Sequence, residues 1–236
     1  MTGGLYEKPR FRLCGDRAVL VEYGDGIDLT VNEKVRSVTA LLKQESWRGV
    51  ETVLPAYRCL MITYDPVETS PGTLADGLLS LEGRLGTAEI PPPRIVDIPV
   101  CYGGIYGPDL EDVAVCHDLT ADEVVDTHAA TVYHIFMLGF APGFCYLGGL
   151  DERLHTPRRT TPRTMLPAGS VGIAEAQTGM YPLDSPGGWR IIGRTPLRLF
   201  APERKHPFLY QAGDKIRFRP VTPAEYNRLD ERVVTT

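Results

Sequence analysis

The sequence has few cysteines and no long apolar run. Its 236 residues include five cysteines with no Cys-x-x-Cys pair, a pattern that predicts reduced thiols rather than a disulfide framework or a zinc knuckle. No stretch approaches about 18 consecutive apolar residues, so no membrane-spanning helix is expected. The N-terminal residues lack the apolar core of a signal peptide, and we therefore expect a cytoplasmic protein.

Positive charge and the common nucleotide and hydrolase motifs are also lacking. The net charge of −5 argues against a nucleic-acid-binding protein, which needs clustered Lys and Arg to neutralise phosphates. The sequence contains no phosphate loop of the form G-x-x-x-x-G-K-[ST], no G-x-S-x-G elbow and no H-E-x-x-H metal motif. No motif therefore assigns a metal or a nucleotide to this chain.

A run of three prolines, Pro91–Pro93, marks the clearest domain boundary. Proline lacks an N–H group and favours extended polyproline geometry, which suits a stiff connector. We expect two domains, residues 1–90 and residues 91–236, in an α+β fold.

The first half has the order strand, helix, strand, strand, helix. Thr30 and Glu33 have the spacing of a capping box, and Ser70 followed by Pro71 is typical of a helix start. The expected strands are residues 19–23, 50–54 and 59–64. This order predicts a small ferredoxin-like α/β sandwich with its helices on one face of an antiparallel sheet.

The second half is dominated by short strands separated by Gly and Pro turns, which predicts a closed or nearly closed β-barrel. Two short helices are expected after its first strand, the second marked by the capping-box spacing of Thr120 and Glu123. The expected strands are residues 94–100, 133–138, 170–174, 189–192, 197–200 and 215–219.

Glycine- and proline-rich phrases cluster between Tyr133 and Phe200. The three densest are Gly139-Phe140-Ala141-Pro142-Gly143-Phe144, Pro167-Ala168-Gly169-Ser170-Val171 and Ser185-Pro186-Gly187-Gly188-Trp189. Turn geometry accounts for most of these residues, and close approach of a ligand to the backbone is the alternative. With the phrases that begin at Thr156, Gln177 and Ile192, they resemble the signature of the KipI and 5-oxoprolinase B-subunit family, also known as allophanate hydrolase subunit 1.

The resemblance extends through both halves of the chain. It implies a cyclophilin-like barrel of the carboxyltransferase type, subdomains C and D, similar to one half of the carboxyltransferase domain of urea carboxylase. The implied activity is that of a hydrolase subunit, namely the B subunit of an ATP-dependent 5-oxoprolinase that opens 5-oxoproline to glutamate. The implied partners are a KipA-like C subunit and a LamB/YcsF-type A subunit. ATP would be used by the complex, and the chain alone would be inactive.

Arginine is concentrated in the same region. Between Arg153 and Arg198 there are seven arginines and two acids, in a chain that is acidic overall. This imbalance indicates an anionic partner, and the planar fork of arginine matches a carboxylate or a phosphate. Arg158, Arg163 and Arg194 lie within the family phrases, so we predict that they bind an anion. Salt bridges at the barrel rim or at a subunit interface are the alternative.

Three other side chains are candidates for catalysis. His128 ends a short helix at a position that the resemblance favours, and we predict that it acts as a general acid or base, a structural histidine being the alternative. Gln177 and Tyr181 are predicted to hydrogen-bond an amide or a carboxylate. Trp189 is expected to be a buried aromatic residue of the barrel, an aromatic platform being the alternative.

Two residues depart from the family pattern inside its motifs. Cys145 stands where proline is usual, and a nucleophilic role for it would need an activating base. Glu175 stands where glycine is usual.

Two other functions remain open. The chain could be a KipI-like inhibitor of a sensor histidine kinase, which needs a binding surface but no catalytic site, or an allophanate hydrolase or urea carboxylase-type subunit. An exposed apolar groove with scattered arginines would favour the inhibitor, and an arginine-lined polar pocket would favour the enzyme. Peptidyl-prolyl isomerase activity rests on fold analogy alone.

Overall fold

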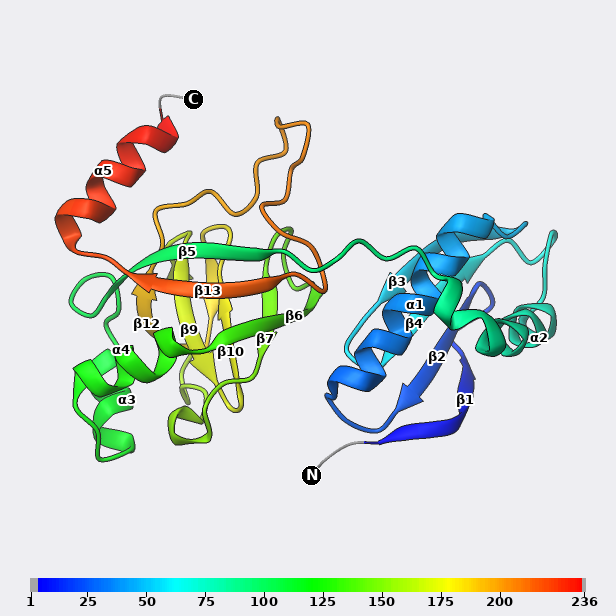
Figure 1. Cartoon of the computed structure of the whole chain (residues 1–236), viewed down its shortest axis with the longest axis horizontal. Coiled ribbons are helices and arrows are strands. Elements are labelled where there is room, and N and C mark those ends of the chain that lie inside the picture. Colours follow the sequence, from blue (N-terminus) through cyan, green and yellow to red (C-terminus); the bar gives the residue numbers. More distant parts are fainter. Residues whose placement is uncertain (1–3, 235–236) are drawn as a thin grey trace. The chain divides into compact units, whose positions relative to one another are not determined.

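The computed structural model describes the backbone of residues 4–234 and the side chains of residues 4–230. The chain forms two compact units, Met1–Pro92 and Pro93–Thr236 (Figure 1). Each unit has its own apolar core. Among the described residues, no helix combines the length and the apolar character that a membrane span requires.

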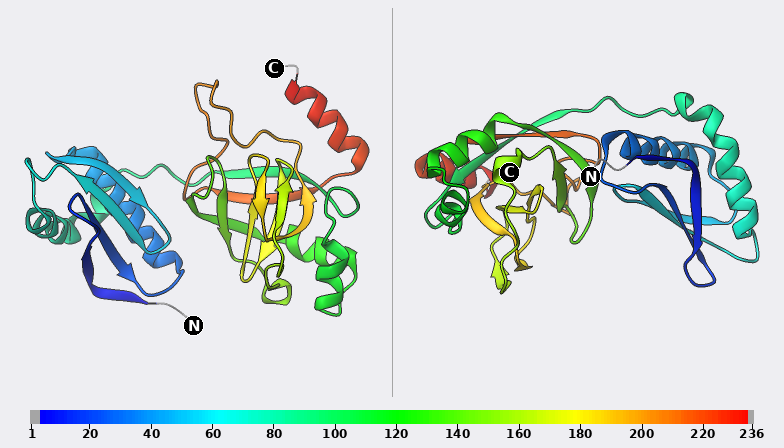
Figure 2. Two further views of the ribbon diagram at one scale, coloured as in Figure 1. Left: turned by 180° about the vertical axis from the view of Figure 1, so that it is seen from behind. Right: turned by 90° about the horizontal axis from the view of Figure 1, so that it is seen from below.

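The N-terminal unit is an antiparallel sheet with helices on one face (Figure 2). Its strands lie in the order β1-β2-β4-β3. Helix α1 connects β2 to β3, and β4 lies between these two strands, which is the split β-α-β arrangement of a ferredoxin-like sandwich. The elements are β1 (Leu5–Leu13), β2 (Ala18–Gly24), α1 (Leu29–Glu45), β3 (Val50–Pro55), β4 (Cys59–Tyr64), α2 (Pro71–Leu81) and the 3₁₀ helix η1 (Glu82–Thr87). Strand β1 lies at one edge of this sheet. The sequence pattern did not predict it.

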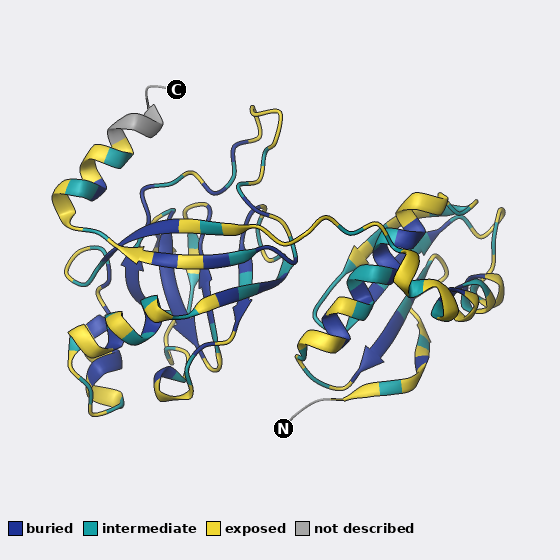
Figure 3. Ribbon diagram, viewed as in Figure 1, coloured by how far each residue is buried: buried dark blue, intermediate teal, exposed yellow. Residues whose placement is uncertain are grey.

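The two helices begin at capped residues. The predicted capping box at Thr30 is wrong by two residues, because the N-cap of α1 is Asp28, whose carboxylate accepts hydrogen bonds from the N–H groups of Thr30 at 2.8 Å and Val31 at 3.2 Å. Helix α2 begins after Ser70, as predicted. The buried residues of α1 face the sheet and form one stripe along the helix (Figure 3).

The C-terminal unit is a closed barrel. Its strands follow the order β10-β7-β6-β13-β5-β12-β9, and β9 pairs with β10 to close the ring. Strands β5 and β13 are parallel, while the other neighbours are antiparallel. The barrel strands are β5 (Ile95–Tyr102), β6 (Val132–Leu138), β7 (Cys145–Gly148), β9 (Ser170–Ala174), β10 (Gln177–Met180), β12 (Arg190–Arg194) and β13 (Lys215–Pro220).

Smaller elements surround the barrel. They are α3 (Leu110–Cys116), α4 (Ala121–Ala130), the 3₁₀ helix η2 (Glu152–Leu154), α5 (Pro223–Val234), and a two-stranded sheet of β8 (Arg163–Leu166) and β11 (Ser185–Gly187). The capping box of Thr120 and Glu123 at the start of α4 is confirmed. The predicted strand at residues 197–200 is wrong. That segment is irregular and contributes only the bridge between Phe200 and Phe208.

Candidate functional site

The outward-facing residues of three neighbouring barrel strands form a surface that we call the outer barrel face. Side chains alternate along β10, so Thr178 and Met180 point into the barrel interior. The outward positions are Gln177, Gly179 and Tyr181, the last of which lies directly after the strand. Tyr146 of β7 lies opposite Gly179, which lies opposite Gly172 of β9. The outer barrel face therefore consists of Tyr146, Gly172, Gln177, Gly179 and Tyr181.

The two glycines of this face make room for Trp189. A Cβ atom on Gly179 would lie 3.0 Å from the Trp189 ring, and one on Gly172 would lie 3.2 Å from the Trp189 Cβ. The Phe144 ring meets the Trp189 ring edge-on, with 5.5 Å between their centroids. The Phe144 ring also meets the Tyr181 ring edge-on, with 5.1 Å between centroids. Trp189 is 5% exposed, so it is buried as predicted and forms the base of the face.

Arg158 lies next to this aromatic base. Burial raises the pKa of Tyr181 to about 12, and the Arg158 guanidinium opposes part of that rise. Burial also raises the pKa of Tyr146, again opposed by Arg158, so the guanidinium lies near both phenols. Arg158 is exposed, and no acid among the described side chains forms a salt bridge with it. A cation with a free fork and two protonated hydroxyl groups can bind a carboxylate. The structure thus brings Arg158, Tyr181 and Gln177 to the same side of the barrel.

The fork of Arg163 is occupied within the chain. Its Nη1 and Nη2 atoms donate to the two carboxylate oxygens of Asp109 at 2.7 and 2.8 Å. Asp109 is 1% exposed, and it also accepts from Arg159 at 2.9 Å and from the N–H of Ile191 at 2.7 Å. Burial alone would raise the pKa of Asp109, and these hydrogen bonds bring it below its ordinary value. These contacts favour the alternative for Arg163, a salt bridge at the barrel rim, over the predicted binding of an external anion.

Arg194 contacts a different set of residues. Its Nε atom donates to the carbonyl oxygen of Ala168 at 2.8 Å, and its charge lowers the pKa of Tyr226 in α5 against the larger effect of burial. The three predicted arginines have no partner in common among these contacts, so they do not form one clamp.

His128 lies inside the C-terminal unit. Its ring is 0% exposed and stacks on Phe218 with 4.6 Å between centroids. The Thr178 hydroxyl donates its single proton to the carbonyl oxygen of Gly172 at 3.0 Å, so it accepts from Nε2–H of His128 at 2.9 Å. Nδ1 then accepts from the Tyr102 hydroxyl at 2.8 Å.

This network fixes His128 as a neutral imidazole. Burial lowers its pKa from 6.5 to about 3, and both ring nitrogens are occupied. The position favours the structural alternative, because a general acid or base must reach its substrate.

Sequence reasoning missed Asp109 and Tyr146. Asp109 precedes α3, where it reads as an ordinary helix N-cap, although its side chain makes no cap hydrogen bond. Tyr146 could have been found from the alternation of Cys145, Tyr146 and Leu147, since a residue between two buried strand positions points outward. Among the described residues, no cluster of His, Cys, Asp and Glu could hold a metal ion.

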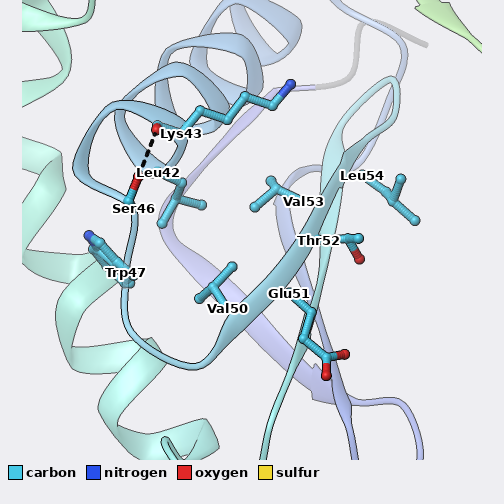
Figure 4. A pocket seen from close by; sticks show the side chains of 9 residues that line it. All are labelled: Leu42, Lys43, Ser46, Trp47, Val50, Glu51, Thr52, Val53 and Leu54. Atoms are coloured by element: carbon cyan, nitrogen blue, oxygen red, sulfur yellow. Dashed lines mark hydrogen bonds between the residues drawn. The ribbon is translucent and has the colours of Figure 1, made fainter.

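The N-terminal unit carries a separate open groove of about 480 Å³ between the end of α1 and β3 (Figure 4). Leu42, Trp47, Val50 and Val53 supply its apolar lining, and Lys43 is at its rim. The groove contains no arginine.

Comparison with known proteins identifies the family. Residues 9–210 match the family described as carboxyltransferase domain, subdomain C and D. The B subunit of 5-oxoprolinase from Bacillus subtilis (strain 168) is 42% identical over 230 residues, which cover 92% of this chain and 95% of that protein. The B subunit of 5-oxoprolinase from Escherichia coli O157:H7 is 40% identical over 217 residues, covering 91% of this chain and 97% of that protein.

A solved structure agrees. The crystal structure of TTHA0988 superposes with a TM-score of 0.76 at 35% identity and covers 87% of this chain, but this region is only 40% of that longer chain. The urea amidolyase of Lachancea kluyveri is more distant, with 25% identity over 14% of its length. The chain belongs to the 5-oxoprolinase B-subunit family, and its fold is that of the carboxyltransferase domain, subdomains C and D.

Proposed function

We propose that this chain is the B subunit of an ATP-dependent 5-oxoprolinase, which opens the lactam of 5-oxoproline to glutamate together with partner subunits. The observation that carries the proposal is the nearly end-to-end similarity, at 42% identity, to a protein of that name. The urea amidolyase match is too distant to favour the urea-type alternative.

In this proposal the outer barrel face would bind the substrate. The substrate is a small cyclic amide with a carboxylate. Arg158 would pair with that carboxylate, while the hydroxyl group of Tyr146 would donate a hydrogen bond to it or to the amide oxygen, and the buried Tyr181 would support the face from behind. Burial raises the pKa of Tyr146, so its hydroxyl group remains a donor at neutral pH. The Gln177 amide lies on the same face and would orient the lactam.

A lactam is a resonance-stabilised amide, and phosphorylation of its carbonyl oxygen by ATP supplies the activation that opening requires. The sequence has no phosphate-loop motif, and we assign no residue of this chain to ATP. A KipA-like C subunit and a LamB/YcsF-type A subunit would complete the enzyme. We therefore expect that the isolated chain shows no 5-oxoproline-dependent ATP hydrolysis.

The test is turnover by the assembled complex. Arg158→Gln should lower kcat/KM about ten- to a hundredfold, because it removes a hydrogen-bonded contact to a charged group. Arg158→Lys should recover only part of this loss, since lysine keeps the charge but lacks the fork. Arg198→Gln is the matched control, because Arg198 is exposed and pairs with Glu203 at 2.6 Å. Wild-type turnover by Arg158→Gln would remove Arg158 from the site, and steady turnover by the isolated chain would contradict the shared site.

A second candidate function is inhibition of a sensor histidine kinase, in the manner of KipI. The open apolar groove beside β3 favours it, although the groove lacks the arginines that such a surface was expected to carry. The kinase's autophosphorylation would be measured with increasing amounts of the wild-type chain and of Val53→Glu. Inhibition that Val53→Glu abolishes would support this function, and no inhibition by the wild type would reject it.

A further inference from the structure

Phe140 is held in an unusual backbone conformation on the surface. Its φ angle is +68°, a left-handed region in which the Cβ of an L-residue crowds the backbone. The other non-glycine residues with positive φ among those described are Ser46, Asp118 and Glu175. Phe140 is the one aromatic residue of this described set, and its side chain is 63% exposed.

The loop around Phe140 is tightly hydrogen-bonded. The N–H of Gly139 donates to the carbonyl oxygen of Phe144 at 3.1 Å, and the N–H of Phe144 donates to the carbonyl oxygen of Ala141 at 3.0 Å. The buried hydroxyl group of Tyr210 donates to the carbonyl oxygen of Gly143 at 2.8 Å. These bonds impose the conformation of the loop, so the exposure of Phe140 is a built feature of the fold.

Phe140 extends the aromatic cluster of the outer barrel face outward. Its ring lies 5.4 Å from the Phe144 ring between centroids, with an interplanar angle of 71°. The Tyr181 ring is 6.2 Å away, with an interplanar angle of 86°. Phe144 and Tyr181 are each 2% exposed. The chain therefore buries the inner rings and leaves the outermost one available for a contact outside itself. Arg158, whose charge acts on Tyr181, is also exposed.

We propose that Phe140 is an anchor for another subunit of the complex, which receives the ring in an apolar pocket and closes the site over Arg158. This inference rests on the proposed function. An exposed aromatic side chain in contact with Tyr181, together with an exposed arginine whose charge acts on the same tyrosine, has the composition of a protein-binding hot spot.

A protein is favoured over the substrate because a small polar lactam offers little apolar surface to a phenyl ring. The relatives that are named as B subunits imply other subunits, and in TTHA0988 the matched region is 40% of a longer chain. Closure by a partner would also exclude water from the activated carbonyl.

The test separates stability from assembly. Phe140→Gly removes the ring and the backbone strain together, so the isolated chain should melt at the wild-type temperature or a few degrees higher, while the dissociation constant for the partner subunits should rise about ten- to a hundredfold. Phe140→Leu, which keeps an apolar side chain, should bind with intermediate affinity. Phe208→Ala is the matched control, because Phe208 is 44% exposed and belongs to a different loop.

The measurements are thermal melting, titration of the labelled chain with its two partner subunits, and turnover at saturating partner. Unchanged affinity of Phe140→Gly would overturn the proposal. Unchanged affinity with a raised KM for 5-oxoproline would also overturn it and place the ring on the substrate. If Phe140→Gly melts well below the wild type, Phe140→Asn, which tolerates positive φ, replaces it in the titration. Weakened assembly in a complex that lacks oxoprolinase activity would leave the anchor intact and reject the proposed function instead.

Discussion

The buried neutral state of His128 makes the barrel sensitive to mild acid. Burial lowers the pKa of His128 from 6.5 to about 3, so the unfolded chain binds a proton at pH 5 while the native chain does not. The native pKa lies below the unfolded one. The stabilisation is therefore complete above about pH 6.5, and it is lost as the pH falls toward 3.

The expected magnitude follows from the two pKa values. Linkage between them predicts that the free energy of unfolding falls by about 2 kcal/mol between pH 8 and pH 5 through His128 alone. Asp109 and Asp214 also have lowered pKa values, but such carboxylates lose most of their contribution below about pH 5. His128→Gln keeps hydrogen-bonding groups in the interior and cannot titrate. Its free energy of unfolding should therefore fall between pH 8 and pH 5 by about 2 kcal/mol less than that of the wild type.

Urea denaturation can isolate this effect in the barrel. The chain has two tryptophans, Trp47 in the N-terminal unit and Trp189 in the barrel unit, so a Trp47→Phe background makes fluorescence report on the barrel. His206→Gln, at an exposed histidine, is the control and should keep the wild-type pH dependence. A wild-type pH dependence of unfolding in His128→Gln would refute the reasoning. An NMR titration of the His128 ring near its ordinary pKa would refute it as well.

Three further outcomes are expected. Glu175→Gly should raise the free energy of unfolding by about 0.5–1 kcal/mol in the same urea assay, because Glu175 has φ of +51° and glycine adopts this conformation without strain; a lower value would show that the glutamate side chain contributes more than the strain costs. Asp109→Asn should lower the free energy of unfolding by about 2–3 kcal/mol, since it breaks a buried ion pair, and a double-mutant cycle with Arg163→Gln should show strong coupling; additive effects would contradict the pairing. The Cys145 thiol is buried, and burial raises its pKa to about 12, so it should resist a thiol reagent in the native chain while the exposed Cys116 reacts; fast labelling of Cys145 would disprove its burial.

Local sequence signals predicted the elements that have strong periodicity or caps. Helices α1, α2 and α4 and strands β2 to β6 were found because their apolar spacing or capping residues lie within one element. Strand β1 was missed because Lys8, Pro9, Arg10 and Arg12 give it the composition of a protected edge rather than of a buried strand. Strands β8, β10 and β11 have three or four residues each, too few to show alternation.

The roles of single side chains depended on contacts between distant segments. Arg163 pairs with Asp109 across 54 residues, and nothing in either local pattern indicates that pair. His128 did carry a signal, because it lies four residues after Val124 on α4 and both are 0% exposed; one helical turn places them on the same buried face. The glycine usual at the position of Glu175 also has a physical reason, namely the positive φ of that turn.

The parallel pairing of β5 with β13 determines when the barrel can form. Ion pairs between Arg94 and Asp214 and between Asp97 and Arg217 join these strands across 120 residues of chain. During synthesis, the sheet of the N-terminal unit has all its strands available long before β13 emerges from the ribosome. Strand β5 must wait with one edge unpaired, and such non-local closure is slow. The interval before β13 arrives is therefore the period when a nascent chain is most exposed to aggregation through that edge, and when a chaperone would protect it most.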